Sequence, residues 1–250
     1  GEEWTFTTGA GIFSSPASAD ITDDDIPDIV VGSRDGNVYA INGVTAGQIW
    51  SYPINEWVNS SPALTDLNGD TVPDAIVAGL DGDVHAIDGV TGGNIWTFPT
   101  GSYIWTSPSL GHLNGDGVAD VVIGADSSNV YAIDGATGTQ IWSFPSMDRI
   151  WSSAALFDLT DDGIPDALVG SDDGYLYGIN GTNGSLMFSY HTDDWIDSSP
   201  AVGDLTGNGL PDIAFGRFDG YVTVIEADAS TVGIAPWPMF RQNLTHNATF

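Results

Sequence analysis

The chain has 250 residues with a formal net charge of -30, no cysteine and no lysine. A field this negative repels phosphate backbones and anionic lipid, so we expect neither nucleic acid nor a bare membrane surface as a partner. The lack of cysteine excludes disulfides and thiolate chemistry. The sequence also contains no apolar run of about 18 residues, so we expect no direct membrane insertion. Bound divalent cations, or a saline setting outside the cell or at its surface, would offset the charge.

One unit of 46 residues repeats along the chain without an insertion, so that Trp50, Trp96 and Trp142 stand at equivalent positions. Each unit contains four short runs of strand-forming residues, separated by turns rich in Asp and Gly. Four strands in a period of about 40 to 50 residues are typical of a propeller blade. The sequence therefore predicts an all-β fold, a five-bladed β-propeller of four-stranded blades.

The fifth unit lacks a tryptophan-containing fourth strand, and residues 1–6 align without a gap with residues 93–98. We therefore predict that the N-terminal strand pairs into the last blade, which closes the ring and removes its open edges. A piece of a larger ring is the alternative. The predicted single domain, 1–250, comprises blades at 14–59, 60–105, 106–151, 152–197 and 198–235 with 1–13, and a tail at 236–250.

A loop with oxygen-bearing residues at alternate positions follows the first strand of each unit. Calcium takes about six to eight oxygen ligands, and alternate positions let side chains converge on one ion. Asp, Asn and Gly also make good turns without an ion, but crowded carboxylates repel each other when unpaired. We expect Ca²⁺ as a structural cofactor at several loops, and the third loop, which begins with His112, to be the weakest or empty. The predicted ligands are Asp20, Thr22, Asp24, Ile26 and Asp28; Asp66, Asn68, Asp70, Val72 and Asp74; Asn114, Asp116, Val118 and Asp120; Asp158, Thr160, Asp162, Ile164 and Asp166; and Asp204, Thr206, Asn208, Leu210 and Asp212.

Two motifs resemble those of known propeller families. The loop Asp66-Leu-Asn68-Gly-Asp70-Thr-Val-Pro-Asp74 resembles the calcium loop of FG-GAP repeats, found in integrin α-subunit propellers, and of bacterial VCBS repeats. Residues 86–96 and 132–142 resemble the tryptophan-docking motif of quinoprotein-type propellers. The resemblance implies a propeller with structural ions on one face. It says little about function, because such families include adhesion proteins, lectins, lyases, dehydrogenases and assembly factors.

The connections between units carry aromatic and polar residues on either side of one apolar column. We expect them on the face opposite the Asp-rich loops, where aromatic rings beside acids suit a sugar or a peptide with a basic residue. The aromatics could instead plug the central channel or pack between blades, which we favour for Trp105 and Trp151. The predicted ligand-binding residues are Trp57, Tyr103, Trp105, Arg149, Trp151 and Trp195.

Nothing in the sequence predicts an active site. No lysine or cysteine nucleophile is available, and His85 takes the position that Tyr39 and Tyr131 hold in other units, which indicates a packing role. We therefore predict a monomeric, non-enzymatic, extracellular or cell-surface calcium-binding propeller that acts as a binding or adhesion module for carbohydrate or protein. The alternatives are a lyase-like enzyme acting on polysaccharides and a protein-docking scaffold.

Overall fold

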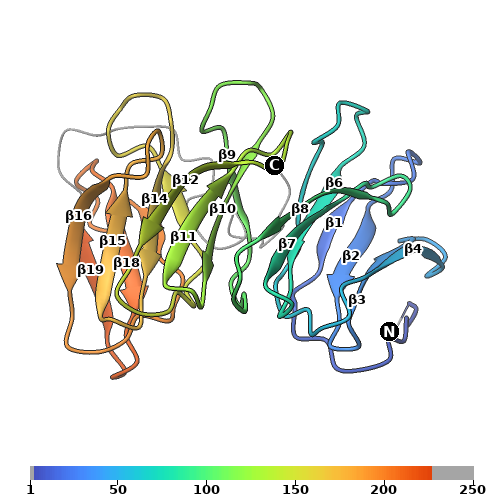
Figure 1. Cartoon of the computed structure of the whole chain (residues 1–250), viewed down its shortest axis with the longest axis horizontal. Coiled ribbons are helices and arrows are strands. Elements are labelled where there is room, and N and C mark those ends of the chain that lie inside the picture. Colours follow the sequence, from blue (N-terminus) through green and yellow to red (C-terminus); the bar gives the residue numbers. More distant parts are fainter. Residues whose placement is uncertain (1–2, 227–250) are drawn as a thin grey trace.

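The computed structural model describes residues 3–226, and every helix or strand assigned in that range is a β-strand (Figure 1). The strands form five antiparallel sheets, four with four strands and the last with three. Within residues 3–226 there is no helix that could cross a membrane. The sheets consist of β1 (Ala17–Ala19), β2 (Asp28–Gly32), β3 (Asn37–Ile41) and β4 (Gln48–Pro53); β5 (Ala63–Thr65), β6 (Asp74–Ala78), β7 (Asp83–Ile87) and β8 (Asn94–Pro99); β9 (Ser109–Gly111), β10 (Asp120–Ala125), β11 (Asn129–Ile133) and β12 (Gln140–Pro145); β13 (Ala155–Phe157), β14 (Asp166–Gly170), β15 (Tyr175–Ile179) and β16 (Leu186–His191); and β17 (Ala201–Gly203), β18 (Asp212–Gly216) and β19 (Val222–Glu226).

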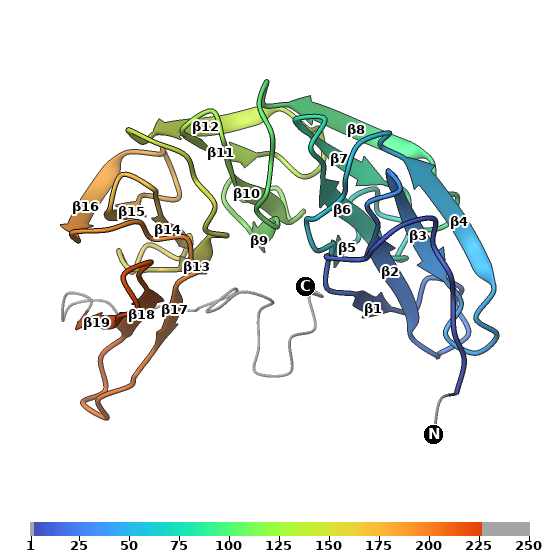
Figure 2. The same cartoon turned by 90° about the horizontal axis from the view of Figure 1, so that it is seen from below.

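Within each sheet the strands lie side by side in sequence order. In the second sheet, for example, β6 and β7 pair Ala75 with Ile87 and Ala78 with Val84. Figure 2 shows the first strand of every sheet on the inner side of an arc and the fourth strand on the outer side. These four-stranded antiparallel sheets confirm the predicted all-β class and are consistent with a β-propeller, each sheet being one blade.

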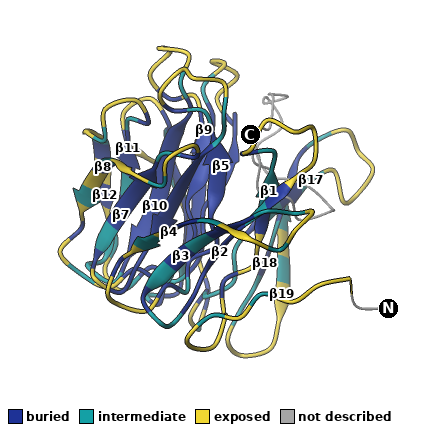
Figure 3. Cartoon of the chain, turned by 90° about the vertical axis from the view of Figure 1, so that its right-hand side faces the viewer, coloured by how far each residue is buried: buried dark blue, intermediate teal, exposed yellow. Residues whose placement is uncertain are grey.

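The core lies between neighbouring blades and is densest on the inner side of the arc (Figure 3). Strands β5 and β6 are buried along their whole length, whereas β8 alternates between exposed and buried residues. The inner strands have a blade on both faces, and so they read as continuous apolar runs. The apolar column of the connections is fully buried at Val58, Ile104, Ile150 and Ile196.

The fourth strands β4, β8 and β12 each dock on the next blade through a tryptophan, whereas β16 has Phe188 at that position. The indole nitrogen of Trp50 donates a hydrogen bond of 2.6 Å to the carbonyl oxygen of Gly89, and Trp96 makes the equivalent bond of 2.7 Å to Gly135. Gly92 faces the Trp50 ring with a φ of +68°, and a Cβ there would lie 2.6 Å from Trp50 Cβ. Glycine is therefore required both by the turn and by the close approach of the indole.

A row of serines joins the inner strands of successive blades, and we call it the serine belt. The backbone N–H of each serine donates to the hydroxyl oxygen of the serine one unit further on, at 2.9 to 3.1 Å. The belt satisfies backbone donors at the inner rim, which is buried at Ser61, Ser107 and Ser153. Its members are Ser15, Ser61, Ser107, Ser153 and Ser199.

Closure of the ring by the N-terminal strand is not confirmed. The last sheet ends at β19, and residues 3–8 belong to no strand. Val222 and Val224 of β19 are 78% and 48% exposed, and the arc in Figure 2 is open between its two ends. The predicted tail at 236–250, the end of the fifth unit after Glu226 and residues 1–2 lie outside the described range. The number of blades in the ring therefore stays a prediction.

Candidate functional site

The last aspartate of each Asp-rich loop is buried and ties the loop to the turn after the third strand. Asp74 accepts hydrogen bonds from the backbone N–H of Leu67 at 2.9 Å and of Gly89 at 2.8 Å. Burial raises the pKa of Asp74 and of its equivalent Asp120 to about 6, although these backbone donors act in the opposite direction. The buried position thus provides a structural acceptor in every blade.

The other loop side chains also accept backbone hydrogen bonds. Asp66 binds the N–H groups of Gly69 at 2.7 Å and Thr71 at 2.9 Å, and Asp70 binds that of Val72 at 2.8 Å. Asp20, Asp158 and Asp204 make comparable bonds in their own loops. The alternating carboxylates therefore have a role as turn acceptors without a cation.

The third loop brings together carboxylates from two segments of the chain. Oxygen atoms of Asp116, Asp120 and Asp134 lie within 4.8 Å of one another, and the side-chain amide of Asn114 donates to all three at 2.9 to 3.2 Å. Asp134 comes from the turn after β11 and was not among the predicted ligands. The one signal for it in the sequence is that Asp88 stands at the equivalent position one unit earlier. In the structure Asp88 likewise accepts from Asn68, at 3.2 Å. Carboxylate oxygens are the donors that calcium takes, so this donor set fits calcium. It belongs to the loop that His112 led us to expect to be the weakest or empty, and calcium binding there stays a prediction.

The opposite ends of the blades form a second surface, which we call the connection face. It comprises the turns between second and third strands and the connections between blades, 8–13, 54–59, 100–105, 146–151 and 192–197. Because the strands of each blade are antiparallel, these turns and connections lie on the side away from the Asp-rich loops. Backbone hydrogen bonds of 3.0 to 3.1 Å join each connection to the turn of the next blade, as from Leu80 N–H to the Trp57 carbonyl and from Asp172 N–H to the Arg149 carbonyl. The face is therefore continuous from blade to blade.

The six predicted ligand-binding residues all lie on the connection face, in two environments. Trp57, Tyr103 and Trp195 are 47%, 58% and 43% exposed. Trp105 and Trp151 are half-buried and pack against each other with ring centroids 5.9 Å apart. The sixth residue, Arg149, is half-exposed beside Trp151.

Each arginine within residues 3–226 sits over an aromatic ring. The guanidinium carbon of Arg34 is 3.3 Å from the ring centroid of Phe13 and 4.5 Å from that of Trp57. Arg149 lies 4.5 Å from Trp151, and Arg217 lies 5.3 Å from Tyr221. Such contacts contribute about 0.5–1 kcal/mol each at exposed sites, and they hold the aromatic side chains of this face in place.

A buried carboxyl pair lies behind these residues. The Asp172 side chain is 1% exposed, and its Oδ2 lies 2.8 Å from Arg149 Nη2. Burial raises the pKa of Asp172, and the neighbouring Asp197 carboxylate raises it further, to about 6, against the lowering effect of Arg149. The repeat does not predict this pair, because the positions equivalent to Asp172 hold Arg34, Leu80, Asp126 and Phe218, so a carboxylate is not a regular feature of the turn. Asp172 can therefore take up or release a proton at a pH of about 6.

A pocket of about 270 Å³ adjoins the pair. It is lined by the fourth-blade turn, including Asp172 and Asp173, and by the connection from His191 to Trp195. Trp195 in turn packs on Phe218, with ring centroids 5.4 Å apart. The connection face therefore combines exposed aromatic rings, carboxylates and a hollow in one region.

Sheets arranged around an arc, with a docking tryptophan on three of the four fourth strands in the described residues, define the class of repeat propellers. A profile of the family described as outer membrane protein assembly factor BamB matches residues 4–145 and 68–191. The chain belongs to this family. Among curated proteins, none matches it.

Solved structures agree on the fold. BamB from Moraxella catarrhalis is 16% identical with a TM-score of 0.62, over 85% of this chain and 63% of its own. Quinohemoprotein alcohol dehydrogenase ADHIIG from Pseudomonas putida HK5 is 18% identical with a TM-score of 0.66, over 91% of this chain and 43% of its own. BBS1N, solved in complex with ARL6DN, is 16% identical with a TM-score of 0.62, over 88% of this chain and 62% of its own. The chain thus spans less than two thirds of each of these proteins.

The family match corrects two expectations. The assignment to FG-GAP and VCBS calcium-loop repeats is wrong, and with it the function of an extracellular calcium-binding adhesion module. The physical reason lies in the loops, where the spacing that would surround an ion also places carboxylates on backbone N–H groups, as in Asp66. The comparisons give no support to carbohydrate as a ligand.

Proposed function

We propose that this chain is a non-enzymatic protein-docking propeller that binds a protein partner through the connection face. The observation that carries the proposal is the row of exposed aromatic residues on that face: Phe13, Trp57, Tyr103, Trp195 and Phe218. Arg34 contacts the first two, and the last two pack on each other. Aromatic residues beside charged groups are enriched at protein interfaces. Because the chain carries a net charge of -30, the partner presents basic and apolar side chains.

The relatives support a docking role. The family is named for an assembly factor of outer membrane proteins, and BBS1N was solved bound to ARL6DN. By analogy we place this chain outside the cytoplasm, as the family description suggests. The extracellular and saline settings expected from the charge stay predictions.

The complete ring is also part of the proposal. Residues 3–7 occupy the place of a fourth strand against the first blade, since Trp4 donates to Gly43 as Trp50 does to Gly89. We expect this segment to pair with β19, which would give the five-bladed ring. Calcium at the Asp-rich loops is likewise proposed as a structural ion, supported by the convergence at Asp116, Asp120 and Asp134.

The test compares partner capture by two variants. A W57A/Y103A/W195A chain removes three exposed rings of the connection face, and a V44A/V90A chain removes two exposed apolar side chains from the opposite face. We expect binding of a captured protein partner to weaken at least about 100-fold in the first variant and to stay unchanged in the second. Equal binding by both variants would exclude the connection face. Turnover of a polysaccharide by the purified chain would instead indicate an enzyme.

A further inference from the structure

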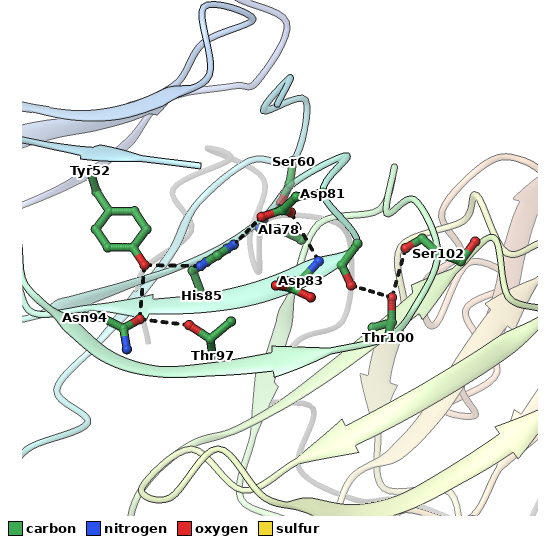
Figure 4. Close-up of polar contacts among 11 residues, drawn as sticks. Tyr52, Ser60, Ala78, Asp81, Asp83, His85, Asn94, Thr97, Thr100 and Ser102 are labelled. Atoms are coloured by element: carbon green, nitrogen blue, oxygen red, sulfur yellow. Dashed lines mark hydrogen bonds and ion pairs between the residues drawn. The ribbon is translucent and has the colours of Figure 1, made fainter. Parts of the chain in front are cut away.

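The second blade carries three possible metal ligands at alternate positions. Asp81 lies in the turn before β7, and Asp83 and His85 lie on that strand. Successive side chains of a strand point to opposite faces, so positions two apart share a face. One ligand atom from each residue lies within 4.8 Å of the other two, and Asp81 Oδ2 is only 2.9 Å from His85 Nε2 (Figure 4).

The other blades show that the fold does not require this set. Blade one has Asp35, Asn37 and Tyr39 at these positions, and the tyrosine hydroxyl donates to Asp35 at 2.9 Å. In blade four the Tyr177 hydroxyl donates to Asp173 at 2.7 Å. A tyrosine therefore satisfies the turn aspartate. Among the described blades, only the second has two aspartates and a histidine at these three positions.

The hydrogen bonds around His85 leave a place for a cation. The Tyr52 hydroxyl donates to Asn94 Oδ1 at 3.1 Å and lies 3.3 Å from His85 Nδ1, so the tautomer with its hydrogen on Nδ1 can donate to the Tyr52 oxygen. Nε2 then directs its lone pair at the Asp81 carboxylate, which has no hydrogen to give (Figure 4). In that tautomer a metal ion fits between Nε2 and the carboxylate. The imidazole is 8% exposed, so water cannot readily take that place.

Asp83 adds a second negative charge next to this position. Its backbone N–H donates to Asp81 Oδ1 at 3.2 Å, while no described donor is hydrogen-bonded to its own carboxylate. Two neighbouring carboxylates repel each other unless a cation is shared between them. The arrangement is therefore incomplete without a positive charge.

We propose that Asp81, Asp83 and His85 bind one divalent transition-metal ion of the zinc type. Zinc takes histidine nitrogen and aspartate oxygen at about 2.0–2.2 Å, and sites with three protein ligands keep one open position. Calcium takes oxygen ligands and does not use the imidazole. A pocket of about 290 Å³, lined by Asp81, Gly101, Ser102 and Tyr103, leaves room for a water or an exogenous ligand in the open position.

The test measures Zn²⁺ binding by calorimetry and Co²⁺ binding by visible absorption, on chelator-treated protein in excess Ca²⁺ to occupy the other carboxylates. Two variants copy the other blades and should therefore fold. D83N restores the asparagine of blade one, and Y52F/H85Y restores the Phe98–Tyr131 pair seen in blade three. H191P is the control, because it removes another histidine and copies Pro53, Pro99 and Pro145.

We expect one Zn²⁺ per wild-type chain, a Co²⁺ spectrum with a nitrogen ligand, and affinity at least about tenfold weaker in both site variants. H191P should bind like wild type. Equal binding by wild type and Y52F/H85Y, or the absence of a one-to-one site in wild type, would overturn the proposal.

Discussion

The indole nitrogen of Trp4 donates a 3.0 Å hydrogen bond to the carbonyl oxygen of Gly43, the residue 39 positions further along the chain. The bonds from Trp50, Trp96 and Trp142 span the same 39 positions. Phe6 packs on Tyr39 as Phe98 packs on Tyr131, edge to face. The N-terminal segment therefore reproduces the outer strand of a blade that would precede the first.

A disulfide can test whether that preceding blade is the fifth. Thr97 pairs with His85 in the second blade, and the equivalent residues of the closing pair are Thr5 and Thr223. Because the chain has no cysteine, T5C/T223C should form one intramolecular disulfide under mild oxidation if five blades close the ring. Non-reducing electrophoresis and mass spectrometry would detect it. Monomers that keep two free thiols would contradict closure, and T5C/T97C is the unpaired control.

The docking tryptophans should contribute strongly to stability. W96F removes the donor to the Gly135 carbonyl and part of a side chain that is 7% exposed. We expect a loss of roughly 2–3 kcal/mol in the free energy of unfolding, from the unsatisfied acceptor and the cavity. Urea denaturation measures it. W57F, at a half-exposed position, should change stability by less than about 0.5 kcal/mol. A loss of stability in W96F as small as that in W57F would show that the docking bond is dispensable.

The pH dependence of stability should report on Asp172. A carboxyl whose pKa is higher in the folded state stabilises the fold while it is protonated. This contribution is lost as the pH rises from its ordinary pKa of about 3.9 through the folded value of about 6. The groups that face it are Asp197 and Arg149.

In D172N, the fall in unfolding free energy between pH 4 and 7 should therefore be smaller by about 1 kcal/mol. Urea melts at several pH values would show it. D193N, at an exposed position of the same pocket, should follow the wild-type curve. If both variants followed the wild-type curve, Asp172 would not be the group that causes the loss of stability between pH 4 and 7.

Calcium should stabilise the Asp-rich loops if it binds there. Saturating Ca²⁺ should raise the melting temperature by about 5 °C and a chelator should reverse the rise. D134N removes one of the three carboxylates grouped at Asp116 and Asp120, so it should reduce the rise in melting temperature caused by calcium. N42D, at the equivalent position of the first blade, should not reduce it. Differential scanning calorimetry measures this. A melt that ignores both calcium and chelator would exclude structural ions.

The sequence was sufficient to predict the blades because the 46-residue repeat keeps strand formers, turn glycines and docking tryptophans in phase. It misled about the loops because an aspartate such as Asp66 looks the same whether it faces an ion or backbone N–H groups. Asp134 was missed because the turn after β11 is distant in sequence and adjacent in space. Asp172 was missed because burial of one turn residue depends on Arg149 and Asp197, which come from neighbouring connections.

The serine belt has a consequence for how such a chain can change in length. Every link uses the same two groups, one N–H and one hydroxyl, a whole unit apart. If residues 60–105 were excised, Ser15 would meet Ser107 in place of Ser61, and the junction would be chemically identical. The belt therefore keeps its register when a complete unit is gained or lost, whereas an insertion of a few residues inside a unit would break that register.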